Sequence, residues 1–126
     1  MSIKFKTVAK KNPRDLQAPA KWYANAIGDG DTTLKDLAEY ASETSTVSKA
    51  DILAVLESTL TKISKDLSGG KIVRVGEYFT LQMSISCNPS DTEEEVNSSK
   101  IKKSKINFRP GKMLSDMIKL ASYQKK

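Results

Sequence analysis

The stretch Phe108-Arg109-Pro110-Gly111-Lys112-Met113-Leu114-Ser115-Asp116 passes from strand character to helix character around a Pro-Gly pair. Proline cannot donate a backbone hydrogen bond to a sheet and glycine is typical of turns, so the pair ends a strand. Apolar residues recur at helical spacing from Lys112 onward, which predicts a helix. The elements upstream of this junction determine which fold that helix closes.

Two strands separated by a polar segment precede the junction. Residues 79–86 alternate strictly, with Phe79, Leu81, Met83 and Ile85 apolar. Period-two alternation predicts a strand with one buried and one solvated face. A turn is expected at residues 88–91 and a returning strand at residues 100–108, while residues 71–75 form a short strand before both. Ile101 has the opposite parity from Ile106 and Phe108, and a bulge or twist would reconcile them.

Two helices are predicted before the strands. The first covers about residues 33–43, with Thr33 as its cap. Ser48 caps a second, longer helix, whose apolar residues follow in steps of three and four: Leu53, Leu56, Leu60, Ile63 and Leu67. Gly69-Gly70 ends this helix, because glycine tolerates the left-handed conformation found there.

The N-terminal segment is predicted to be an extension, residues 1–32, that packs on a main domain of residues 33–126. Ile3 and Phe5 alternate with lysines, which indicates a short strand, and the aromatic residues near Trp22 favour a second one. We expect the first strand to pair at a sheet edge of the main domain and Trp22 to be at least half buried.

The positive charge of the chain is segregated. Twenty-one Lys and Arg face 15 Asp and Glu, for a net charge of +6. Residues 98–126 carry nine basic groups and one acid, residues 1–22 carry six and one, and four acids without a base lie between Cys87 and Asn97. Such segregation favours a polyanionic partner, nucleic acid first and an anionic membrane second.

Composition argues against catalysis. The chain has no histidine, which removes the commonest general base and zinc ligand. Its single cysteine cannot form an internal disulfide, which favours a reducing cytoplasm. Carboxylates at residues 93–95 fit a solvated loop better than a metal site. We therefore expect no enzyme activity, no cofactor and no metal, and no apolar run is long enough to span a bilayer.

In order and spacing, residues 33–119 resemble the bacterial HU and integration host factor family. Residues 108–116 resemble the family stretch Phe-Lys-Pro-Gly-Lys-Ala-Leu-Lys-Asp, and Gly70-Lys71-Ile72-Val73-Arg74-Val75-Gly76 is a supporting match. The resemblance implies an α+β fold: a helical hairpin, a three-stranded antiparallel sheet with a protruding arm at about residues 84–104, and a closing helix. The N-terminal segment resembles an extended branch of the same family.

The tip of the predicted arm departs from the family. Asn88-Pro89 partly matches the family's Arg-Asn-Pro-Gln-Thr-Gly, but the arginines are missing and acids follow. The resemblance implies a proline that wedges between base pairs in the minor groove. An ordinary turn proline is the alternative, and it is favoured because Asp91 and residues 93–95 would repel phosphates.

The candidate DNA-binding residues are basic residues of the arm and its base, with the tip dipeptide: Lys100, Lys102, Lys103, Lys105, Arg109, Lys112, Asn88 and Pro89. Edge protection against aggregation is the alternative role for the arm lysines. Strand alternation places Lys103 and Lys105 on one face and Lys100 and Lys102 on the other, unless a bulge intervenes.

A dimer is expected, either a homodimer or a heterodimer with a similar chain. The second helix presents more apolar surface than one small sheet can cover, and the resemblance implies an interlocked pair. The predicted interface residues are Leu53, Leu56, Leu60, Ile63, Phe79 and Phe108. The resemblance implies an architectural protein of the nucleoid that binds DNA largely without sequence preference and bends or compacts it. A protein-interaction module with weak or lost DNA binding is the alternative.

Overall fold

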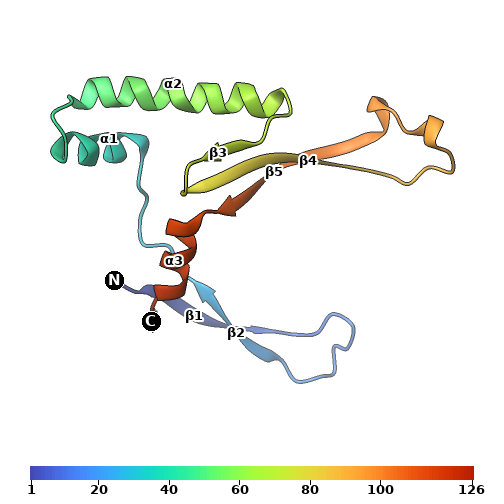
Figure 1. The fold of residues 1–126 in the computed structure, drawn as a ribbon. Coiled ribbons are helices and arrows are strands. Elements are labelled where there is room, and N and C mark those ends of the chain that lie inside the picture. Colours follow the sequence, from blue (N-terminus) through green and yellow to red (C-terminus); the bar gives the residue numbers. More distant parts are fainter. The chain divides into compact units, whose positions relative to one another are not determined.

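The computed structural model describes all 126 residues and has a mixed α+β fold with three α-helices and two three-stranded sheets. The predicted α+β class is therefore confirmed. The chain forms two compact units, which Figure 1 shows: a terminal unit of residues 1–33 and 117–126, and a central unit of residues 34–116. None of the helices is both long and apolar enough to cross a bilayer.

The central unit begins with the predicted helical hairpin, α1 (Leu34–Glu43) and α2 (Lys49–Ser68). The Ser48 hydroxyl accepts a hydrogen bond from the Asp51 amide at 3.2 Å, which confirms the predicted cap. At the other end Gly70 has φ +87°, its amide donates to the Leu67 carbonyl, and the Lys71 amide donates to the Asp66 carbonyl. This is the Schellman arrangement, so the predicted glycine stop is confirmed at Gly70.

The sheet of the central unit is antiparallel, in the order β3 (Val73–Val75), β4 (Phe79–Cys87) and β5 (Ile101–Pro110). In Figure 1, β4 and β5 form a long two-stranded ribbon that extends beyond β3 and ends in an irregular tip. Two 3₁₀ turns lie in that tip, η1 (Glu93–Glu95) and η2 (Ser98–Lys100). Lys100 therefore belongs to a turn, one residue before the returning strand in which it was expected.

The Pro-Gly junction is held by a close approach of two backbone segments. The Gly111 amide donates to the Tyr78 carbonyl at 2.7 Å, just before α3 (Lys112–Leu120) begins. A Cβ atom added at Gly111 would lie 2.1 Å from the Glu77 carbonyl oxygen. Only glycine fits there, so this position locks the base of β5 and the start of α3 against the turn before β4.

The terminal unit has its own sheet, in the order β2-β1-β6. Its central strand β1 (Ile3–Lys10) pairs antiparallel with β2 (Lys21–Ala26) and parallel with β6 (Tyr123–Lys125). Both predicted strands are confirmed, but the expectation that the first would join an edge of the main sheet is wrong. A C-terminal strand that the sequence analysis did not identify takes the free edge of β1 instead. Division of the chain into domains after residue 32 stays a prediction.

The predicted burial of Trp22 is also wrong, because its side chain is 70% exposed. It lies on β2, an edge strand of a small sheet. No element of the chain covers it, since all six residues of β2 are exposed.

A single chain buries almost none of its apolar side chains. Only Ala38 and Leu67 are buried. Of the predicted interface residues, Leu60 and Phe108 are 51% and 55% exposed, and the others are only partly buried. Phe79 and Phe108 do contact one another, with ring centroids 5.6 Å apart. The ribbon and α2 therefore present an apolar surface that one chain does not cover.

We predict that Gly111→Ala destabilises the central unit, because the new methyl group would overlap the Glu77 carbonyl. Overpacking of this kind costs about 1–3 kcal/mol or more. Gly28→Ala is the matched control, since nothing lies within 4 Å of the position of its Cβ. Urea denaturation followed by helical circular dichroism should give a lower midpoint for Gly111→Ala alone. Equal midpoints for the two variants would contradict the close approach.

Candidate nucleic-acid interface

Pairing between β4 and β5 separates an apolar face from a polar one. Leu81 pairs with Phe108 and Met83 with Ile106, so these side chains share one face. Alternate positions occupy the other face, in the pairs Thr80 with Arg109, Gln82 with Asn107, Ser84 with Lys105 and Ser86 with Lys103. The polar face therefore consists of cations interspersed with hydroxyl and amide groups.

The polar face holds four exposed cations and no carboxylate. Lys103, Lys105 and Arg109 come from β5, and Arg74 comes from β3, where it pairs with Thr80. Residues two apart along a strand are about 6.6 Å apart, so these cations form a row along β5 that broadens at Arg74. A hollow on this face is lined by Arg74, Gln82, Lys105, Asn107 and Arg109, among others. Such a surface offers hydrogen-bond donors and positive charge to an extended anion.

A bulge at Lys102 sets which lysines share this face. Ser86 pairs with Lys103 and Cys87 pairs with Ile101, so Lys102 is the extra residue on β5. The expected bulge is confirmed, and it returns Ile101 to the apolar face with Ile106 and Phe108. Lys103 and Lys105 share the polar face as expected. Lys100 and Lys102 do not form an opposite pair, because one lies in a turn and the other at the bulge.

The tip beyond the bulge is acidic and solvent-exposed. Asn88 and Pro89 follow β4 directly and both are exposed. The tip carries Asp91 and the three glutamates of η1, and the Asn97 side chain accepts a hydrogen bond from the Ser99 amide at 3.0 Å. The two tip residues proposed for DNA contact are thus separated from the cationic strand face and lie near four carboxylates in sequence.

Lys112 lies apart from the cationic strand face. It begins α3 and lines a hollow with Glu77, Tyr78, Met113 and Asp116, two of which are acids. Two of the backbone amides near this helix start are already occupied, since Gly111 donates to Tyr78 and Met113 donates to Glu77. These two amides could reach a phosphate only by giving up those contacts.

Arg74 was missed by the sequence analysis. The signal was present, because Arg74 stands between Val73 and Val75 in a short alternating strand. Alternation alone places it on the face opposite the valines. Which face of the neighbouring strand it joins depends on the register between β3 and β4, which a sequence of three strand residues does not specify.

Comparison with protein families gives one match over nearly the whole chain. Residues 1–125 match the family described as an HU domain fused to a wHTH, Ig or glycine-rich motif. No curated protein sequence matches the chain.

A solved structure shares the fold. It is a crystal structure from Bacteroides vulgatus ATCC 8482, described provisionally as a bacterial DNA-binding protein, and it superposes with a TM-score of 0.68 at 11% sequence identity. The match covers 98% of this chain and 48% of the other. The chain therefore spans about half the length of that structure.

Proposed function

Because the chain belongs to the family of HU domains fused to other motifs, we propose that it binds duplex DNA through the cationic face of β3, β4 and β5. One observation carries the proposal: Arg74, Lys103, Lys105 and Arg109 share a strand face that holds no carboxylate. The neighbouring structure described as a DNA-binding protein has the same fold, which supports the same assignment.

Phosphate contacts are the proposed source of affinity. Each phosphate that a lysine or arginine neutralises releases condensed counterions, which drives binding without regard to base sequence. The face also presents Thr80, Gln82, Ser84 and Asn107, whose side chains suit hydrogen bonds to phosphate and sugar oxygens. These contacts position a duplex without reading it, so low sequence specificity and a location on the nucleoid follow.

A dimer is the proposed binding unit. The uncovered apolar surface of α2 and of the ribbon is large for one chain, and a second copy presents the same surface in a symmetric pair. Two ribbons would then flank one duplex, and the bending of DNA between them is part of the proposal. In a heterodimer, a partner with a similar chain would cover the same apolar surface.

We predict that Leu60→Ala weakens assembly and folding together, because Leu60 is 51% exposed in the single chain and would be buried in the pair. Truncating a buried leucine costs about 2–5 kcal/mol. Ser58→Ala, on the opposite side of α2, is the control. Light scattering and urea denaturation should show a shifted dimer equilibrium for Leu60→Ala only. A folded wild-type monomer at micromolar concentration would refute the dimer.

We predict that Lys103→Gln with Lys105→Gln weakens binding to all DNA sequences alike and reduces the salt dependence of binding, by about 0.9 in slope for each phosphate that is no longer neutralised. Lys100→Gln with Lys102→Gln removes the same charge from the same arm and should have a smaller effect. The measurement is a gel-shift titration with linear, nicked and four-way-junction DNA at two salt concentrations. Absence of any shift for the wild-type protein at low salt would overturn the proposed function.

The acidic tip supplies a test of the alternative, a protein-interaction module. Replacing Glu93, Glu94 and Glu95 by glutamine removes three charges that repel phosphate. We predict a higher affinity for DNA, measured in the same titration, if the tip lies near the duplex. Unchanged DNA affinity together with loss of a bound protein partner would favour the interaction module instead.

A further inference from the structure

The net positive charge of the chain lies entirely in the terminal unit. Residues 1–33 and 117–126 contain nine Lys and Arg and three Asp and Glu. Residues 34–116 contain 12 of each kind, because the basic arm strand is offset by the acidic tip and by the helices. The unit that holds the candidate interface is therefore neutral, and the +6 belongs to the unit built on the small sheet of β1, β2 and β6.

The lysines of β1 and β2 gather on one face of that sheet. Pairing of β1 with β2 places Lys4, Lys6 and Lys10 on the same face as Lys21 and Tyr23. The opposite face carries mainly apolar side chains, namely Ile3, Phe5, Ala9, Trp22, Ala24, Ala26 and Tyr123, together with Thr7 and Lys125. The cationic face contains no carboxylate along β1 or β2.

Two lysines oppose one another at the end of the β1–β2 hairpin. Lys10 pairs directly with Lys21, a like-charge arrangement that destabilises a sheet. Neither lysine pairs with a carboxylate, since the ion pair in the chain joins Lys62 and Asp66 on α2. The Lys10 ammonium instead lies 5.6 Å from the centre of the Tyr23 ring, a cation–π contact. A bound anion would offset the like charges of this pair.

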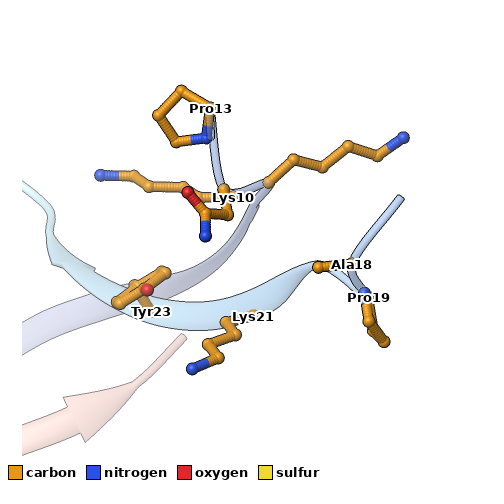
Figure 2. A pocket seen from close by; sticks show the side chains of 8 residues that line it. Lys10, Pro13, Ala18, Pro19, Lys21 and Tyr23 are labelled. Atoms are coloured by element: carbon orange, nitrogen blue, oxygen red, sulfur yellow. The ribbon is translucent and has the colours of Figure 1, made fainter. Parts of the chain in front are cut away.

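The loop between β1 and β2 contains hydrogen bonds between side chains and backbone amides. The Asn12 side chain accepts a hydrogen bond from the Arg14 amide at 3.0 Å, and the Asp15 side chain accepts one from the Gln17 amide at 3.1 Å. The nearest carboxylate in sequence is thus engaged with backbone. A hollow lies between the loop and the strands, as Figure 2 shows, lined by Lys10, Lys11, Asn12, Pro13, Ala18, Pro19, Lys21 and Tyr23.

We propose that this cationic face, ending in the hollow at Lys10 and Lys21, is a second DNA-binding surface that contacts backbone phosphates. The assignment of DNA as the polyanion rests on the proposed function. A membrane surface fits less well, because interfacial binding needs apolar side chains beside the cations, and here most of them lie on the opposite face. The Lys10 ammonium lies against the Tyr23 ring, and Lys10, Lys21 and Tyr23 all line the hollow.

The test compares two variants of the 126-residue chain with equal loss of charge. Lys10→Gln with Lys21→Gln removes the opposed pair, while Lys119→Gln with Lys125→Gln removes two lysines of the same unit that lie away from the hollow. DNA affinity is measured by fluorescence anisotropy from about 50 to 200 mM salt. If two phosphates are no longer neutralised, the slope falls by about 1.8, so the wild type should lose about twelvefold more affinity than the hairpin variant over this range.

Additional variants distinguish the possible outcomes. Lys10→Arg with Lys21→Arg should restore wild-type behaviour, because arginine also contacts phosphate. Equal effects of the hairpin and control variants would overturn the site, since net charge alone would explain them. Weakening by Lys103→Gln with Lys105→Gln but not by the hairpin variant would overturn this inference and leave the proposed function standing. Weakening by the hairpin variant alone would support this inference and overturn the strand-face proposal.

Wild-type protein that binds no DNA at low salt would overturn both proposals. Vesicles containing anionic lipid serve as the last comparison. Binding to vesicles that the hairpin variant loses, with DNA binding unchanged, would assign the cationic face to a membrane and overturn its assignment to DNA.

Discussion

The antiparallel register between β4 and β5 is the constraint on which the candidate interface depends. A slip of one residue would place Lys103 and Lys105 on the face of Leu81 and Met83, and would move Phe108 to the opposite face. The register is anchored at one end by Gly111, whose amide contacts the Tyr78 carbonyl at 2.7 Å. At the other end the bulge at Lys102 keeps Ile101 on the apolar face. Both devices act on the backbone, one at each end of the stretch whose alternation holds the cations on one side.

The apolar face that this register produces has no cover within the chain. Two buried side chains cannot supply the hydrophobic stabilisation that a domain of this size requires. Folding and assembly would therefore be coupled in the proposed dimer, and the proposed DNA-binding face would depend on an interface of which it is not a part. Association would bring two copies of the cationic strand face into one particle.

Charge along the chain and charge in space lead to different conclusions. Along the sequence, the lysines of residues 100–105 form the densest basic run and draw attention to the arm. In the folded chain that run shares a unit with the acids of the tip and of the helices, which cancel it in sum. The last ten residues belong to the same unit as β1 and β2. The positive charges of the two ends of the chain therefore add together in that unit. The charge of one strand face thus acts on a ligand at contact, whereas the net charge of a whole unit acts at longer range.

The sequence alone determined most of the elements and the character of each face of the β4–β5 ribbon. Local physical signals were sufficient for this: the cap at Ser48, the glycine stop at Gly70, alternation through β4 and parity along β5, which indicated the bulge before its position was known. Tertiary structure decided which elements pair. Four features depend on contacts between segments distant in sequence or on strand register. They are the pairing of β6 with β1, the exposure of Trp22, the position of Arg74 on the cationic face and the pairing of Lys10 with Lys21. A short strand of three residues carries no local signal for its partner, because pairing energy arises only when the two strands meet.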